Sequence, residues 1–260
     1  MTLKIGVLVK QVPDTNSKIQ LQGDQIDASG LKFVVNPYDE FGVEEALKTK
    51  EIWEKAGQKV ETVAVLLGPK AAQKALRDVL AVGLDRGVHI LDEEGKASDP
   101  KSVSEALKTV CQEEGFHLIF AGKQAVDSDS HATAQMLAEH LKIPHVGVVS
   151  KIDFEGKEMA QVERAVDGGS KEIFKLKLPA LITANKGLNK MRMASLINIR
   201  KAAKKEVKEV PLPSVQADWK VRSWSLPSER AAVKMIEGDM NTQAAELVRL
   251  LKEEAKVIGS

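Results

Sequence analysis

The sequence predicts an α/β fold: a doubly wound, mostly parallel sheet of the Rossmann-like, adenine-nucleotide-binding kind. Up to residue 152, short apolar runs alternate with longer segments whose apolar residues recur at helical spacing. That rhythm is typical of parallel strands joined by right-handed helical crossovers. Beyond residue 152 the chain changes to strands joined by short turns. The sequence therefore predicts an α/β domain over residues 1–195, with small antiparallel additions, and a C-terminal arm over residues 196–260.

Uninterrupted aliphatic runs predict the strands of the parallel part, at residues 3–9, 60–67, 87–91, 117–121 and 146–152. Helical periodicity predicts the helices between them, at residues 37–55, 71–82, 98–113 and 130–141. Local signals support two of these ends. Ser98 or Asp99 would cap a helix that has Pro100 in its first turn, and Gly57 follows the first helix as a stop.

Two further regions carry turn signals. Residues 10–33 are polar, and Gln22-Gly23-Asp24 predicts a small hairpin outside the main sheet. Residues 160–166, 172–178 and 180–184 read as strands, with Asp167-Gly168-Gly169 as the tight turn between the first two.

The last quarter of the chain differs in composition. Residues 200–208 are basic, but Glu206 interrupts them and aromatic residues are absent, which favours a solvated helix or strand face over nucleic-acid binding. Residues 210–227 are proline-spaced and contain Trp219 and Trp224, so we expect an extended arm. Residues 241–256 return to helical periodicity. Such an arm either wraps a partner subunit or folds back on its own domain, and the pattern fits both.

Composition excludes several classes of protein. The 260 residues carry a net charge of +1, which gives no long-range attraction to nucleic acid or to a membrane surface. No segment approaches the roughly 18 consecutive apolar residues of a membrane span, so we expect no direct membrane insertion. The single cysteine, Cys111, cannot form an internal disulfide, and its place in a helical pattern indicates a buried structural thiol.

The polar stretch of residues 122–131 is the main candidate for a ligand site. It follows the apolar strand at 117–121 and precedes a predicted helix, which places it at the carboxyl edge of the sheet, where α/β folds bind ligands. Free N–H groups at the helix start favour phosphate there. Asp129 or Ser130 would be a good N-cap, so capping alone is the alternative explanation. The common glycine-rich phosphate motifs are absent from the sequence.

We find no set of catalytic residues in the sequence. Asp127, Asp129 and His131 could suggest a metal cluster, but the five histidines show no paired ligand spacing, so we expect no metal. Cys111 has no histidine at helical spacing, and no Ser/His/Asp set stands out. The residues alone therefore give no recognisable catalytic site.

Several strings in a fixed order resemble the β subunit of electron-transfer flavoproteins. They cover nearly the whole chain to about residue 210. The most informative is VERAVDGGSKEIFKLKLPALITANKGLN at residues 162–189, and the others are IGVLVK at 5–10, VNPY at 35–38, GLDRG at 83–87 and GKQAVD at 122–127. The resemblance implies a carrier that moves electrons from acyl-CoA and related dehydrogenases, in fatty acid oxidation, to a quinone oxidoreductase. It implies a heterodimer in which the α subunit holds most of an FAD, and it favours partner wrapping by the arm. The N-terminus carries no targeting segment, unlike mitochondrial members, so we expect a bacterial cytoplasm.

The resemblance also implies an AMP site. The matching positions are Val9, Asn36, Leu67, Gly122, Gln124, Asp127, Asp129, Ser130, His131, Ala132 and Thr133. The family's Asn-Gln-Thr-Gly run is His131-Ala132-Thr133-Ala134 here, so the glutamine and glycine are replaced by alanines. The bifurcating branch, which places a second FAD in this pocket, has a D-G-D-T motif where this chain has DSDS at 127–130, so the non-bifurcating branch is favoured.

Two more functional regions follow from the resemblance. Tyr38 occupies the position of an aromatic residue near the FAD ring system, whereas Thr15 stands where a second aromatic is usual. Residues 189–199 match the recognition loop for acyl-CoA dehydrogenases, with Leu196 as the anchor. The neighbouring contact positions are Met193, Ala194, Ser195 and Ile197, the last replacing a family proline. The alternative from another class is a stand-alone adenine-nucleotide-binding protein of the same fold, which would have little reason to carry the arm.

Overall fold

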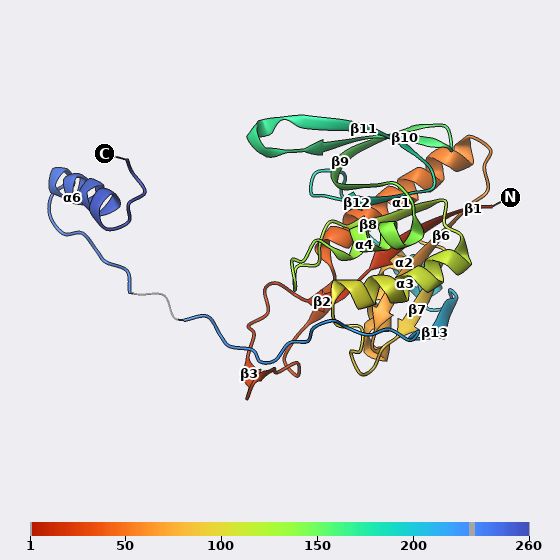
Figure 1. Ribbon diagram of the computed structural model, residues 1–260, viewed down its shortest axis with the longest axis horizontal. Coiled ribbons are helices and arrows are strands. Elements are labelled where there is room, and N and C mark those ends of the chain that lie inside the picture. Colours follow the sequence, from red (N-terminus) through yellow and green to blue (C-terminus); the bar gives the residue numbers. More distant parts are fainter. Residues whose placement is uncertain (1, 229–231, 260) are drawn as a thin grey trace. The chain divides into compact units, whose positions relative to one another are not determined.

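The computed structural model describes residues 2–228 and 232–259, and Figure 1 traces the chain. The chain divides into two compact units, Met1–Ser223 and Trp224–Ser260. The first contains the α/β fold and the candidate site, and the second contains one helix.

A nine-stranded sheet forms the centre of the first unit, in the order β11-β10-β9-β12-β8-β1-β6-β7-β13. The strands from β9 to β13 in this order run parallel, and β10 and β11 add antiparallel at one edge. Their bounds are β1 Leu3–Val9, β6 Val60–Gly68, β7 Arg86–Leu91, β8 Leu118–Gly122, β9 His145–Glu155, β10 Met159–Ala165, β11 Lys171–Lys177, β12 Ala180–Ala184 and β13 Val207–Pro211. The mostly parallel sheet with antiparallel additions confirms the predicted fold class.

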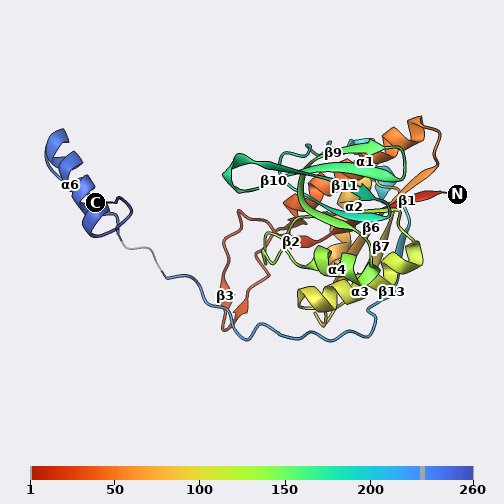
Figure 2. The same cartoon turned by 45° about the horizontal axis from the view of Figure 1, so that its top comes forward.

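Helices cover both faces of this sheet (Figures 1 and 2). The bounds are α1 Pro37–Lys55, α2 Gln73–Val82 after the short 3₁₀ turn Lys70–Ala72, α3 Pro100–Glu114, α4 Thr133–Leu141 and α5 Leu196–Ala202. One buried cluster contains side chains of α1 and α2, and the other contains side chains of α3 and α4, including the free thiol of Cys111. Burial raises the pKa of that thiol to about 12, so it stays protonated and structural, as predicted.

The predicted hairpin region is also present. β2 Gln11–Pro13 pairs with β5 Phe33–Val35, and β3 Leu21–Gln22 pairs with β4 Gln25–Ile26. Gly23 adopts a φ of +63° in the turn between the latter two, a conformation that glycine accepts without steric penalty. Asp167–Gly169 forms the turn between β10 and β11, as expected.

The start of the predicted arm belongs to the first unit. β13 joins the main sheet beside β7, and Val210 and Leu212 pack against the core cluster under α3. The basic run is therefore only partly a solvated face. Lys205 donates to the carbonyls of Leu80 and Leu84 at the end of α2, where a cation satisfies free carbonyl groups. The first unit thus extends to Ser223, beyond the residue 195 at which the sequence suggested a boundary.

Asp99 fixes the chain that follows β13. It caps α3, accepting from Ser102 N at 2.7 Å, and it also accepts from the backbone N–H of Asp218 and Trp219 at 2.6 and 3.3 Å. Burial alone would raise the pKa of Asp99, but these hydrogen bonds outweigh it and hold the pKa at about 2. One carboxylate therefore joins a helix start to a segment more than a hundred residues away.

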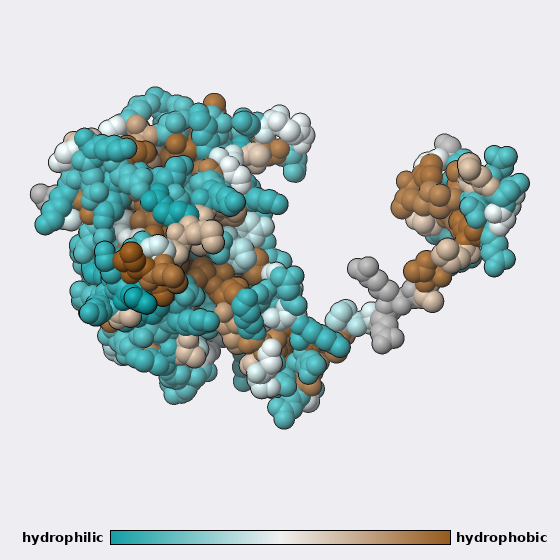
Figure 3. Space-filling view, turned by 180° about the vertical axis from the view of Figure 1, so that it is seen from behind, coloured by the Kyte–Doolittle hydropathy of each residue, from teal (hydrophilic) through white to brown (hydrophobic). Residues whose placement is uncertain are grey.

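The second unit contains α6, Met240–Glu253, which Asp239 caps through Thr242 N at 2.8 Å. No residue of α6 is buried, and Met240, Leu247 and Val248 are exposed. Figure 3 shows apolar surface gathered on this unit. Among residues 2–228 and 232–259, no helix is both long and apolar enough to cross a bilayer.

Candidate nucleotide site at the carboxyl edge of the sheet

The candidate site begins where β1 and β8 end side by side, because parallel neighbours bring their carboxyl ends to the same edge. β1 ends at Val9, which is buried, and β8 ends at Gly122, where the loop of residues 123–132 starts. The N-terminus of α1 meets both of them. Residues from three distant parts of the chain are therefore brought together.

Asp39, in the first turn of α1, joins these parts. Its carboxylate accepts from Lys10 N at 2.7 Å, from Gly122 N at 3.2 Å and from the amide of Asn36 at 2.8 Å. Asn36 also donates to the carbonyl of Gln124 at 2.9 Å and accepts from Val126 N at 3.1 Å. The side chain of Asn36 is buried and holds the loop in place. Asp39 was not among the residues selected from the sequence, although Asn36-x-x-Asp39 resembles a capping pattern that could have drawn attention to it.

Gly122 allows this close approach. A Cβ at Gly122 would lie 2.4 Å from Asp39 Oδ1, 2.7 Å from the carbonyl carbon of Tyr38 and 2.8 Å from Asp39 N. Two of these atoms are backbone and cannot move independently of α1. Any larger residue at position 122 would therefore clash with the start of α1.

Burial raises the pKa of Asp39 to about 7, against the hydrogen bonds from Asn36, Lys10 and Gly122. Its ordinary value is 3.8, so between pH 3.8 and about 7 the folded protein keeps a proton that the unfolded chain releases. The contribution of Asp39 to stability therefore falls as the pH rises through this window. We expect the carboxyl ¹³C resonance of Asp39 to titrate near pH 7, and the fall in stability to be absent from Asp39→Asn. A resonance that titrates below pH 4 would contradict this expectation.

The loop is tied down further by its own side chains. Lys10 Nζ pairs with Asp127 at 2.7 Å, and Gln124 donates to Asp129 at 2.6 Å. Lys123 Nζ lies 4.9 Å from the centre of the Tyr38 ring, in a cation–π arrangement. Tyr38 is half-buried. Lys10 and Lys123 supply positive charge beside a loop that otherwise carries two aspartates.

The helix after this loop begins later than the sequence suggested. α4 starts at Thr133, so the prediction that it begins at Ser130 with Asp129 or Ser130 as N-cap was wrong. Asp129 and His131 adopt φ values of +48° and +47°, and the Asp129 carboxylate is occupied by Gln124. The N-cap residue is Ala132, which has no side chain to cap with. The first-turn N–H groups of α4 are thus left for another acceptor, as a phosphate site requires.

Other residues of interest lie in α4, at the end of β6 and on either side of the α4 start. Ala134 is buried in the core cluster with Leu137 and Ala138. Leu67 is half-buried near the end of β6. Nε2 atoms of His131 and His145 are buried without a hydrogen-bond partner in the described chain, and burial lowers the pKa of both rings. Buried polar atoms of this kind usually receive their missing hydrogen bond from a ligand or an ordered water.

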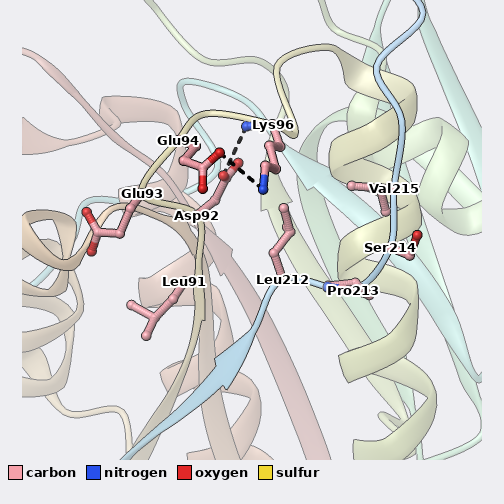
Figure 4. Close-up of a pocket in the computed structure, with 9 residues that line it drawn as sticks. All are labelled: Leu91, Asp92, Glu93, Glu94, Lys96, Leu212, Pro213, Ser214 and Val215. Atoms are coloured by element: carbon pink, nitrogen blue, oxygen red, sulfur yellow. Dashed lines mark hydrogen bonds and ion pairs between the residues drawn. The ribbon is translucent and has the colours of Figure 1, made fainter.

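A separate cavity of about 430 Å³ lies at the ends of β7 and β13 (Figure 4). Its rim carries Asp92, Glu93 and Glu94, and the Asp92 carboxylate accepts from Lys96 N and Ala97 N at 3.0 and 2.9 Å. This acidic rim disfavours a phosphate. The described residues contain no group of three or more potential metal ligands.

The predicted recognition segment lies beside α1 and at the start of α5. Met193 and Leu196 are 94% and 79% exposed, and Ile197 is also exposed. Ser195 caps α5 by accepting from Asn198 N at 3.2 Å, whereas Ala194 packs against the core. The sequence therefore selected an exposed apolar patch together with two residues that support it.

Comparison with known proteins identifies the family. Residues 25–215 match the pattern of the electron transfer flavoprotein domain. The chain is 40% identical to the electron transfer flavoprotein subunit beta of Bradyrhizobium diazoefficiens and 37% identical to that of Bacillus subtilis. Each comparison covers 98% of this chain and 100% of the relative. The chain belongs to the electron transfer flavoprotein β-subunit family. The Mus musculus subunit beta, 36% identical over 98% of this chain, shows that the likeness extends to animals.

Proposed function

We propose that this chain pairs with an electron transfer flavoprotein α subunit and that the heterodimer carries electrons from acyl-CoA and related dehydrogenases to a quinone oxidoreductase. In this proposal the chain has no catalytic activity of its own. FAD, held mainly by the α subunit, supplies the redox chemistry when bound. This chain forms one wall of the flavin cavity with Tyr38, and it works in the cytoplasm of a bacterium.

The observation that carries the pairing is the uncovered apolar surface of the second unit. Besides Met240, Leu247 and Val248 on α6, the exposed large apolar residues in the described part of this unit are Trp224, Leu226, Val233, Met235, Val257 and Ile258. A continuous chain with this much exposed apolar surface is typical of a segment that buries it against another subunit. A stand-alone adenine-nucleotide-binding protein would have no use for it.

AMP is the proposed ligand of the loop at residues 122–133. The uncapped start of α4 offers N–H groups to the phosphate, and Lys10 and Lys123 offset the charge of the aspartates. The hydroxyls of Ser128, Ser130 and Thr133 have no hydrogen-bond partners in the described parts of the chain, so they remain available as donors. The fit relies on backbone groups, which tolerate Ala132 and Ala134. A second FAD in this pocket, as in the bifurcating branch, is the alternative.

Docking is assigned to residues 189–199, with Leu196 as the anchor in an apolar pocket of the dehydrogenase. A few exposed apolar side chains rimmed by polar ones are what a transient redox partner recognises. Ile197 stands where the family pattern has a proline, and Met193 adds a further exposed apolar side chain.

Anaerobic reduction tests this function. The co-expressed heterodimer, mixed with an acyl-CoA dehydrogenase and its acyl-CoA, is expected to lose the visible absorbance of its oxidised flavin. Flavin that stays oxidised with every acyl-CoA dehydrogenase tried, while dithionite reduces it, would contradict the proposed electron donor.

A further inference from the structure

The segment of residues 189–195 is bound to α1 by charge-assisted hydrogen bonds. Arg192 donates to the Glu44 carboxylate from its backbone N–H and its guanidinium, at distances from 2.8 to 3.2 Å. Another guanidinium nitrogen donates to Glu51 at 2.5 Å. A forked guanidinium binds a carboxylate with a directionality that a lysine cannot reproduce. One arginine therefore spans two turns of the helix.

Two acidic residues of α1 depend on this segment for their hydrogen-bond partners. Glu44 and Glu45 are buried, and a buried carboxylate is strongly destabilising unless it is paired. Asn189 donates to Glu45 and to the carbonyl of Phe41, both at 2.9 Å. Without Arg192, Glu44 would lose the cation that compensates its burial.

These contacts decide which side chains of the segment face outward. Met191 and Ala194 pack against the core cluster, and Met193, between them, is exposed. Leu196 then begins α5, whose far end is held where Arg77 donates to the carbonyl of Ala202 at 2.9 Å. Both ends of the exposed patch are thus attached to the helices of one face.

We propose that Arg192 is a positioning residue for docking of the redox partner: its pairing with Glu44 holds Met193, Leu196 and Ile197 in one arrangement before the partner arrives. This inference rests on the docking role proposed above for residues 189–199. A pre-ordered segment loses less conformational freedom when it binds. The loss of Arg192 therefore affects affinity for the partner and leaves electron transfer in the docked complex unchanged.

The test uses the heterodimer as electron acceptor for an acyl-CoA dehydrogenase, with the heterodimer concentration varied. Arg192→Ala is expected to raise KM about tenfold and to leave kcat within about twofold, the pattern of lost binding alone. Arg192→Lys keeps the charge without the fork and is expected to fall between. Backbone hydrogen exchange in residues 189–195, measured without the dehydrogenase, is expected to rise about tenfold in Arg192→Ala.

Arg200→Ala is the matched control, because it removes the same charge from exposed α5 and Arg200 has no ion pair among the described residues. It is expected to keep the KM and exchange of the parent protein. Equal rises in KM for Arg192→Ala and Arg200→Ala would assign the effect to charge attraction and overturn the positioning role. An unchanged KM in Arg192→Ala beside a raised KM in Leu196→Ala would overturn only the positioning role. An unchanged KM in Leu196→Ala would contradict the proposed docking itself.

Discussion

Replacing Gly122 by alanine is expected to destabilise the protein by about 3 kcal/mol, the upper range for forcing a methyl group into a packed interior. The added Cβ would lie 2.4 Å from Asp39 Oδ1 and less than 3 Å from the backbone at Tyr38 and Asp39. Relief requires the N-terminus of α1 to move away from β8. That movement breaks the hydrogen bonds by which Asp39 holds residue 10 and residue 122. Urea denaturation measures the change in stability.

Gly30→Ala is the control for this substitution. Gly30 lies in the insertion between β4 and β5, and a Cβ there would meet nothing within 4 Å. The free energy of unfolding of Gly30→Ala is expected to stay within about 0.5 kcal/mol of that of the parent protein. The co-expressed complex of Gly122→Ala should also lose nucleotide, whereas that of Gly30→Ala keeps it. A fully stable Gly122→Ala would mean that α1 and β8 do not approach as closely as described.

Replacing Asp99 by alanine is expected to cost about 3 kcal/mol and to release residues 212–223 from the first unit. The variant loses the cap of α3 and leaves the N–H groups of Asp218 and Trp219 without their acceptor. Because the folded pKa of Asp99 is about 2, below its ordinary 3.8, its contribution is fully present above pH 3.8. It is lost as the pH falls through about 2. Hydrogen exchange and limited proteolysis of residues 212–223 report the release.

Asp239→Ala separates capping from anchoring. Asp239 caps α6 by accepting from Thr242 N, and among the described residues it holds no distant segment. The Asp239→Ala variant is expected to lose about 1 kcal/mol of stability within the second unit and to leave residues 212–223 protected from hydrogen exchange and proteolysis. If Asp99→Ala and Asp239→Ala had equal effects, the contact of Asp99 with Asp218 and Trp219 would contribute nothing.

The order of strands and helices could be predicted because each element carries a local signal. α1 spans Pro37–Lys55, as predicted. A proline marks its first turn, and Gly57, with a φ of +80°, turns the chain away just after the helix ends. β13 could not be predicted as part of the sheet. Its pairing with β7 joins residues about 120 positions apart, and its charged residues Lys208 and Glu209 resemble a solvated surface. Long-range pairing leaves little trace in a single strand.

The candidate site was located from the sequence only in outline. Its position between an apolar strand and a predicted helix pointed to the polar stretch of residues 122–131, and the structure places that stretch at the carboxyl edge of the sheet. The start of α4 was misplaced because Asp129, a typical cap residue, binds Gln124 instead. Asp39 and Arg192 were missed because their roles depend on partners elsewhere in the chain: Lys10 and Gly122 for Asp39, Glu44 for Arg192.

The most direct measurement is the small-molecule content of this chain co-purified with its α subunit. The complex is denatured and the released FAD and AMP are quantified by chromatography. We predict one FAD and one AMP per heterodimer, with the backbone of the α4 start holding the phosphate despite Ala132 and Ala134. One FAD without AMP would contradict the proposed nucleotide site but leave the electron-carrier function standing. Two FADs per heterodimer would place the protein in the bifurcating branch. A chain that forms no complex and carries no flavin would contradict the account.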